Sequence, residues 1–495
     1  MSETEYRSGV MLNIHEPGEL IDESNQSDAT YSNTDIRAEK SDKELELQRE
    51  EEEVDADPNI DRGYAWVICF ACVLFNFSTY GMNSGFAIYF ATYVNQGTFP
   101  GATKIDYAYI GGLAFGAGLL FSPVITVLMG LLGFRTVLII GNCLQFTSLM
   151  LASWSTKLWQ LYLTQGVMQS FGLAFLGIPA TTILPQYFKK KRVLAGGIGA
   201  AGSGLGGIVF NLAMQKVVDE KGVPWALRAQ SIIAFGLIWI AIILAKSKAD
   251  THNIQFKFFD VNIVKTAPFW MLIFFVITCI FGYVILLYTL SNFTTSLGYT
   301  ERQGSYASAL VQVGSCVGRP IVGLISDRFG GATVACVGYY IVGIFCLAMW
   351  IPARNLATVL VFAVIQGSLM GAIYGMSAPL MARLFGIKKM NIVFAQAWTI
   401  MGVAGIWSPV IGVKLTSGSG AGLDPTRYVN CAIFTGVCFM ACATALLLIR
   451  GYVKSRDKIM EEQGHTDSDL LDYTGVSVPF FSVFTHCFAT SKEKV

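Results

Sequence analysis

Charged side chains are scarce in this sequence and almost missing from its long apolar stretches. Only 14% of the 495 residues are charged, 53% are hydrophobic, and the mean hydropathy is +0.52. None of the four histidines lies in a stretch long enough to span a membrane. Soluble domains carry about 25% charged residues. The composition therefore excludes an ordinary soluble protein and indicates a chain embedded in a membrane.

The residue patterns of metal sites, phosphate loops and nucleophile elbows are also missing from the sequence. Ten of the eleven cysteines stand singly in apolar runs between residues 69 and 442, as small buried hydrophobic side chains do. The glycines of residues 202–207 lie inside an apolar run and not between a strand and a helix, as a phosphate loop requires. We therefore expect no cofactor and no metal, and neither an ATP-driven pump nor an enzyme.

Charge is unevenly distributed along the chain. Nineteen of the thirty-four acidic residues precede residue 62, whereas the rest of the chain holds thirty Lys and Arg against fifteen Asp and Glu. Residues 1–60 are acidic and poor in aromatics, which predicts a disordered cytosolic tail. The basic remainder is typical of a membrane protein whose cytoplasmic loops face anionic lipid, and it does not indicate nucleic-acid binding.

Twelve apolar runs of about 20 residues or more follow the tail, each long enough to cross a hydrocarbon core of about 30 Å. They lie near 64–94, 107–131, 136–155, 158–185, 193–217, 226–246, 267–297, 304–326, 332–352, 355–384, 391–416 and 429–450. The predicted organisation is a six-helix bundle over 61–246, a cytosolic link at 247–266, a second bundle over 267–450 and a cytosolic tail over 451–495. The expected fold is an all-α membrane protein.

The basic loops predict the orientation. With the N-terminus inside, seventeen Lys and Arg fall in cytoplasmic segments and nine on the opposite face. By the positive-inside rule both termini are expected in the cytosol. Residues 189–192 are four consecutive cations, and Gly, Ala and Ser recur immediately after them. Small residues at this spacing give a membrane helix two faces at which neighbouring backbones approach closely.

The two bundles repeat each other. Gln165-Gly166 in the fourth run recurs as Gln366-Gly367 in the tenth, and basic links follow both runs. A glycine-rich turn after the second run recurs after the eighth as Gly323-Leu-Ile-Ser-Asp327-Arg328-Phe-Gly330. Two six-helix pseudo-repeats with the substrate site between them are the organisation of facilitator transporters.

Residues 61–450 resemble the monocarboxylate transporter family of the major facilitator superfamily. The resemblance rests on Tyr187-Phe188, Arg192, Gly202 and Ser203 of the fifth run, and on Asp61, Gly63 and Trp66 before the first. Gly199, Arg62 and Ala65 depart from the family pattern. The long acidic tail resembles the fungal branch, which includes a riboflavin transporter. The 323–330 turn is similar to the facilitator loop motif, so the resemblance implies a gating role for it.

Two of three groups that the resemblance implies for proton coupling are absent. The span-one lysine of proton-coupled members corresponds to Ser84 here, and the span-eight aspartate corresponds to Ser315. The arginine is present as Arg319. Moreover, no Asp, Glu or His stands well inside any predicted span, and an arginine stays protonated. The sequence therefore favours facilitated diffusion over proton symport.

Arg319 is the one charge we place inside the bilayer. Such a charge is costly and is usually retained for function. The alternative is that Arg319 pairs with helix-end carbonyls or with Asp327 and anchors the eighth span.

Neutral residues complete the expected substrate site, although hydrogen bonding between helices is the alternative reading for each of them. Asn76, Tyr80, Asn83 and Ser84 are predicted to share one face of the first span. Gln165, Tyr283, Gln366 and Tyr374 come from the fourth, seventh and tenth spans.

A pocket of amides, rings and one cation suits a planar polar solute. The leading hypothesis is therefore a plasma-membrane facilitator for a riboflavin-like or other planar polar solute. A proton-coupled monocarboxylate symporter is the alternative, and a non-transporting nutrient sensor is the alternative from another class. Regulatory proteins that bind the tails are a further expectation.

Overall fold

The computed structural model describes residues 60–248, 260–416, 424–462, 473, 476 and 478–487. Within these ranges the regular elements are helical, and they form twelve spans that are long and apolar enough to cross a membrane. The predicted fold class is thereby confirmed. The predicted N-terminal tail, apart from Ile60, and most of the predicted 247–266 link lie outside the described residues.

The first six spans form the N-half. Several of them are composite, because short π or 3-10 segments interrupt the α-helix. The N-half consists of α2 (Tyr64–Asn76), η1 (Phe77–Gly81), α3 (Met82–Ser84), α4 (Phe86–Gln96), α5 (Lys104–Gly116), η2 (Leu119–Phe121), α6 (Ser122–Leu132), α7 (Phe134–Ala152), α8 (Leu158–Leu161), η3 (Tyr162–Met168), α9 (Gln169–Ile183), η4 (Leu184–Gln186), α10 (Arg192–Lys221) and α11 (Val223–Leu244).

The last six spans form the C-half, which the short helix α12 (Val261–Val264) precedes. The C-half consists of α13 (Ala267–Ser296), α14 (Glu301–Phe329), α15 (Gly331–Phe345), η5 (Cys346–Trp350), α16 (Leu356–Met370), α17 (Ala372–Phe385), α18 (Ile387–Leu415), η6 (Pro425–Tyr428) and α19 (Val429–Glu462). A last short helix, α20 (Phe480–His486), follows it.

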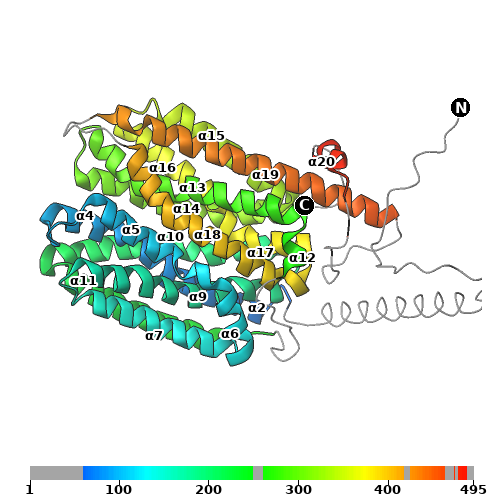
Figure 1. The fold of residues 1–495 in the computed structure, drawn as a ribbon, viewed down its shortest axis with the longest axis horizontal. Helices are drawn as coiled ribbons and strands as arrows, with labels where there is room; N and C mark the ends of the chain where they lie inside the picture. The colour runs from blue at the N-terminus through cyan, green and yellow to red at the C-terminus, as the bar shows by residue number, and fades with distance from the viewer. Residues whose placement is uncertain are drawn as a thin grey trace, which may run out of the picture.

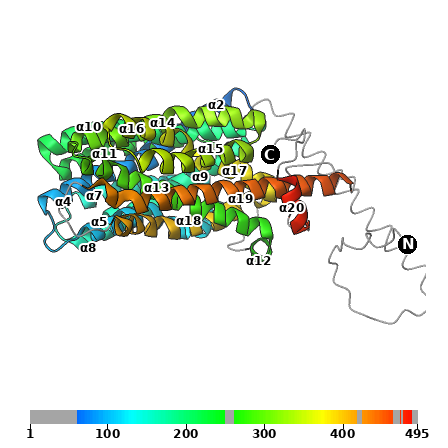
Figure 2. The same ribbon diagram turned by 90° about the horizontal axis from the view of Figure 1, so that it is seen from above.

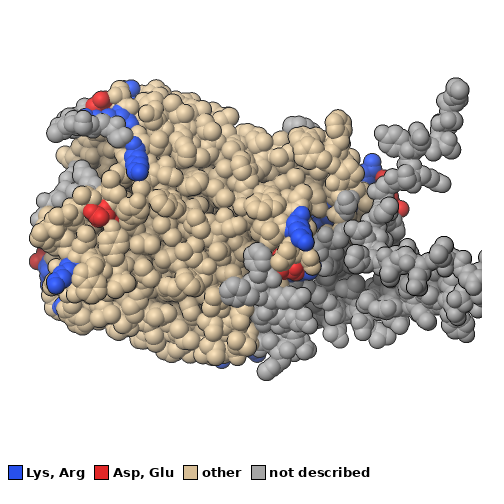
Figure 3. Space-filling model, viewed as in Figure 1, with Lys and Arg blue, Asp and Glu red and all other residues tan. Residues whose placement is uncertain are grey.

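The two halves lie side by side, and the axes of their helices are roughly aligned with one another (Figures 1 and 2). We call the end at which α2 begins and α19 leaves the tail end. Acidic and basic side chains gather at the two ends of the visible face, and uncharged residues cover the region between them (Figure 3). This distribution matches a bundle whose middle is in hydrocarbon, since charged side chains are expensive there.

Helix α10 contacts both halves through glycine. A Cβ on Gly202 would lie 2.2 Å from Val73 O, and one on Gly206 would lie 2.3 Å from Phe77 O, both in the N-half. On another face, a Cβ on Gly196 would lie 2.3 Å from Gly375 O in the C-half. These distances are far shorter than ordinary contacts, so only glycine allows the backbones to approach this closely. The expected close-packing face at Gly202 and Gly206 is confirmed. The second face was expected at Ala195 and Gly199, whereas the contact with the C-half is made by Gly196.

The two faces predict different effects of an added methyl group. Gly202→Ala is expected to lower the stability of the protein by about 1–3 kcal/mol, because the methyl group overpacks a contact inside one half. Gly196→Ala is expected to cost less, because the halves can separate slightly at that contact. Thermal unfolding of both variants in detergent tests this, and equal losses would contradict it.

The last span is longer than hydropathy predicts. The apolar run was expected to end at 450 and to be followed by a tail, but α19 continues to Glu462. Beyond the apolar run, Arg456 is fully buried and donates to Asp457 Oδ1 at 2.6 Å and to Arg383 O at 2.8 Å. Hydropathy marks where the hydrocarbon ends, whereas these polar contacts extend the helix beyond it.

Candidate functional site

Arg319 joins the two halves of the bundle. It lies on α14 of the C-half, and its side chain is only 3% exposed. Its Nη1 donates to Ala200 O at 2.7 Å and to Ser203 Oγ at 2.5 Å, both on α10 of the N-half. The guanidinium is therefore held in the interface between the halves.

Two tyrosines contact this guanidinium, and the ring of a third packs against one of them. Nη2 of Arg319 donates to the Tyr283 hydroxyl at 3.2 Å, and the guanidinium carbon lies 5.4 Å from the centre of the Tyr374 ring, within cation–π range. The Tyr374 ring lies 5.6 Å from Tyr283 and 5.8 Å from Tyr80, between ring centroids. Tyr80 belongs to the N-half and the other two rings to the C-half. The rings thus meet across the interface beside the cation.

Within the described part of the chain, no carboxylate matches the positive charge of Arg319. Its hydrogen bonds in the described residues go to a carbonyl and two hydroxyls, and its buried Nε has no partner there. Gly371 stands against this nitrogen, since a Cβ on Gly371 would lie 2.3 Å from Nε. A cavity of about 10 Å³ adjoins the side chain, with room for no more than one water.

Asp327 does not pair with Arg319, which was the structural alternative for this arginine. Its Oδ1 accepts from Val193 N at 3.1 Å and its Oδ2 from Leu194 N at 3.0 Å. These amides lie in the first turn of α10. The Asp327 carboxylate of the C-half therefore caps a helix of the N-half, and its negative charge interacts favourably with the helix dipole.

A second carboxylate, from within the N-half, holds the turn that leads into the same helix. Asp61 accepts from Lys190 N at 3.0 Å and from Lys191 N at 3.1 Å. Its φ of 57° is left-handed, a conformation that Asp tolerates better than most residues. The tail end of α10 is therefore held twice, once by its own half through Asp61 and once by the other half through Asp327.

The remaining residues of the facilitator loop motif have simpler positions. Gly323 packs on α10, because a Cβ there would lie 2.7 Å from Val193 O. Gly330 has a φ of 93°, which glycine adopts readily, and it separates α14 from α15. Arg328 is exposed at the tail end.

The two family signatures contact each other, although about 120 residues separate them. The Trp66 ring packs edge-on against Phe188 at 5.2 Å between centroids, and Asp61 N donates to Tyr187 O. The Tyr187 hydroxyl donates to Lys246 O at 2.7 Å, and Arg192 Nε to Phe188 O at 2.7 Å. Gly63 has a φ of 52° and directly precedes α2. These residues build the tail end of the N-half.

The expected polar stripe of the first span is broken. The π segment η1 changes the helical phase between Asn76 and Asn83, so a single 3.6-residue period does not apply. Asn76 Nδ2 bonds its own helix at Cys72 O, and Asn83 accepts from Gln169 Nε2 inside the N-half. Ser84 Oγ donates to Gly81 O. Among the four, Tyr80 is the one whose ring packs against Tyr374, which in turn contacts Arg319.

Two predicted amides lie inside their own halves. Gln165 is 1% exposed within η3. Gln366 is fully buried, and its Nε2 donates to Val342 O at 3.1 Å. Ser315, which replaces the family aspartate, donates to Gly367 O at 3.0 Å. The Gln366 and Ser315 bonds connect neighbouring helices of the C-half.

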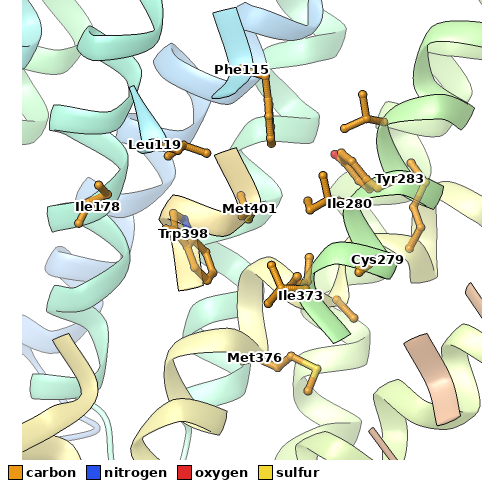
Figure 4. Close-up of a cluster of buried hydrophobic side chains, with 14 of the residues drawn as sticks. Phe115, Leu119, Ile178, Cys279, Ile280, Tyr283, Ile373, Met376, Trp398 and Met401 are labelled. Atoms are coloured by element: carbon orange, nitrogen blue, oxygen red, sulfur yellow. The ribbon is translucent and has the colours of Figure 1, made fainter. Parts of the chain in front are cut away.

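Sequence reasoning missed part of the interface. Ser203 was assigned to the signature, yet its hydroxyl is a direct partner of Arg319. Phe115 of α5 also lies in the interface: its ring is 6.5 Å from that of Tyr80, and it packs on Gly405 of α18. Figure 4 shows Phe115, Tyr283 and residues of α17 and α18 in one apolar cluster. No local pattern marks such residues, because their neighbours belong to the other half.

Comparison with known proteins agrees with this architecture. The sequence model of the Major Facilitator Superfamily matches residues 67–409 and, in a second match, 272–490. The chain belongs to the major facilitator superfamily. Relatives within it are named as transporters, and this major facilitator protein is accordingly a membrane transporter and not an enzyme.

Two yeast proteins and one solved structure give the scale of the likeness. "Probable transporter MCH2" of Saccharomyces cerevisiae is 44% identical over 411 residues, which cover 82% of this chain and 86% of the relative. "Uncharacterized transporter ESBP6" of the same yeast is 33% identical over 83% of this chain and 63% of its own length. The Escherichia coli fucose:proton symporter FucP has the same fold, with a TM-score of 0.58, 15% identity, and coverage of 78% of this chain and 99% of FucP.

Proposed function

We propose that this transporter carries a small planar organic solute with an acidic group, bound at Arg319 and its three tyrosines. The observation that carries the proposal is the unmatched charge of Arg319. A buried guanidinium without a carboxylate is costly, and an anion supplied by the substrate offsets that cost. Arg319 Nε is the donor left free for it among the described residues.

The rings support a planar solute. Tyr80, Tyr283 and Tyr374 meet beside the cation, and aromatic faces stack on flat ligands while the guanidinium binds a carboxylate through parallel hydrogen bonds. An aromatic acid has both the required shape and the anion. A riboflavin-like molecule has the shape, but it is neutral near pH 7 and offers Arg319 only uncharged acceptors such as carbonyls. A simple monocarboxylate satisfies the cation but leaves the rings without a partner.

Alternating access is part of this proposal. The 10 Å³ cavity beside Arg319 is far smaller than the 300–1,000 Å³ of ordinary ligand sites. The halves must therefore separate before a solute enters. The Asp327 cap and the Arg319 bonds to α10 are the contacts that would break on one side, in the manner of rocking repeats.

Facilitated diffusion is the transport mode we favour. Among the described residues of the spans, the Asp and Glu side chains lie near the ends of the bundle, and Asp106 and Asp327 are examples. Proton coupling generally needs a titratable group deeper in the membrane. The alternative is a proton-coupled monocarboxylate symporter, which Arg319 alone would serve as an anion site. We place the protein in the plasma membrane with the basic tail end and both termini in the cytosol.

Uptake by purified protein in liposomes tests the proposal. Riboflavin, benzoate and lactate are compared with and without an inward proton gradient. Saturable uptake of benzoate that is indifferent to the gradient is the expected result. Saturable uptake of riboflavin in its place would keep the planar solute but remove the acidic group from the proposal. Lactate uptake that rises with the gradient, with neither ring compound transported, would replace the proposal by the symporter.

The ring beside Arg319 makes a separate prediction. Tyr374→Ala is expected to raise the KM for the ring compound about 10-fold, because stacking and cation–π contact together contribute about 1–2 kcal/mol. Tyr374→Phe keeps the ring and is expected to stay within about 3-fold of the parent. Concentration-dependent uptake measures both. An alanine variant with an unchanged KM would show that the ring does not contact the solute.

A further inference from the structure

Helix α20 has two different faces. Val483 and Cys487 are 2% and 3% exposed, whereas Phe480, Phe481 and Phe484 are 70%, 82% and 50% exposed. The Phe480 and Phe484 rings lie 5.0 Å apart between centroids and so form one apolar patch with Phe481. Three exposed phenylalanines on seven residues are unusual for a surface in water, where such patches mark an interaction site.

The buried face of α20 is fixed to α19. Ser455 Oγ donates to Ser482 O at 2.9 Å, Cys487 Sγ lies 3.5 Å from Leu447 O, and Arg450 Nη1 donates to Cys487 O. Gly451 allows the approach, because a Cβ there would lie 2.3 Å from Val483 O. The helix is therefore attached along residues 447–455 of α19 and does not float at the end of a tail.

The attachment point sets the depth of α20. The apolar part of α19, residues 429–449, is about 31 Å long at 1.5 Å per residue, the thickness of the hydrocarbon core. Residues 447–455 then lie across the boundary between hydrocarbon and headgroups. Figures 1 and 2 both place α20 beside α19 at the tail end of the bundle.

Charge at the tail end fits the same surroundings. Lys458 of α19 and Arg328 of α14 are exposed, as are the three lysines of residues 189–191. Cations at this level attract anionic lipid headgroups. The apolar patch of α20 thus lies at the depth at which aromatic side chains partition into a membrane interface.

We propose that α20 is an interfacial anchor. Its Phe480, Phe481 and Phe484 face inserts into the headgroup–acyl boundary of the leaflet at the tail end, while its other face is held by α19. The anchor fixes to the bilayer the part of α19 that extends beyond its apolar run. It does not depend on which solute is transported.

Fluorescence of a labelled full-length chain tests the anchor. Phe481→Cys carries an environment-sensitive fluorophore in a background where Cys143 and Cys316 are serine, because these two cysteines are not buried. Glu461→Cys, exposed on α19 beyond the interface, is the matched control. In nanodiscs containing brominated lipid, the Phe481→Cys label is expected to be quenched at least ~3-fold more than the control label. Iodide in the water should quench the control label more than the Phe481→Cys label.

Equal quenching of both labels by iodide would overturn the anchor, because the patch would then face water. Protection from both quenchers, with self-quenching that grows with the labelled fraction, would also overturn it in favour of a second copy of the chain. The native chain provides an independent arm in case the variants do not fold. A photoactivatable lipid should label the peptide holding residues 480–486 and not the one holding 461–462, and the converse would contradict the proposal.

Discussion

Replacing Arg319 by methionine is expected to abolish saturable uptake while leaving the thermal stability equal to or above that of the parent. The guanidinium is buried without a carboxylate among the described residues, and apolar replacement of a buried charge is often neutral or stabilising. Uptake should fall at least ~100-fold, because a charge-assisted pair of hydrogen bonds contributes about 3–6 kcal/mol. Uptake assays and thermal unfolding of the same preparation measure both effects.

Two further variants separate charge from geometry at this position. Arg319→Lys keeps the charge but cannot make the forked contact, so about 10-fold of the uptake should be lost. Arg354→Ala is the matched control, because that arginine is exposed and its hydrogen bonds within the described residues go to Ile351 O and Ala353 O at the other end of the bundle. If Arg319→Met lost stability in parallel with uptake, the arginine would be a structural link between the halves and not a substrate site.

Asp327→Asn is expected to move the equilibrium of the two halves toward separation at the tail end. The carboxylate accepts from two amides of α10, and an amide side chain offers one acceptor and no charge. Loss of such a cap costs about 1–2 kcal/mol, which corresponds to a ~5–30-fold shift. A cysteine at Ser326, 3% exposed in the wall of the Arg319 cavity, should react faster with an aqueous maleimide by this factor.

Asp61→Asn is the matched control for this experiment. It removes a similar pair of carboxylate–amide bonds from the turn just before the same helix, but Asp61 and α10 belong to the same half. It should lower the unfolding temperature without accelerating the labelling of the Ser326→Cys variant. Equal acceleration by both substitutions would mean that Asp327 merely stabilises the helix start. The reagent must be tested in a background with Cys143 and Cys316 replaced, since neither is buried.

The proposed substrate site was predictable only in part. Arg319, Tyr283 and Tyr374 were all expected, and the structure brings them together with Tyr80. Asn76, Asn83 and Ser84 were expected beside Tyr80 and do not reach this cluster through any bond described, because the π segment η1 changes the helical phase. A regular period read from sequence cannot anticipate a π turn, since the turn depends on how the neighbouring helices pack.

The sequence by itself determined the twelve spans, the close-packing glycines of α10 and the single deep charge. These follow from local properties: hydrophobic length, small side chains and the cost of a cation in hydrocarbon. The tertiary structure alone decided that Asp327 caps α10, that Ser203 holds Arg319 and that α20 is clamped to α19. Each of these contacts joins segments far apart in the chain, so it depends on how whole helices pack and leaves no trace in the pattern of either segment.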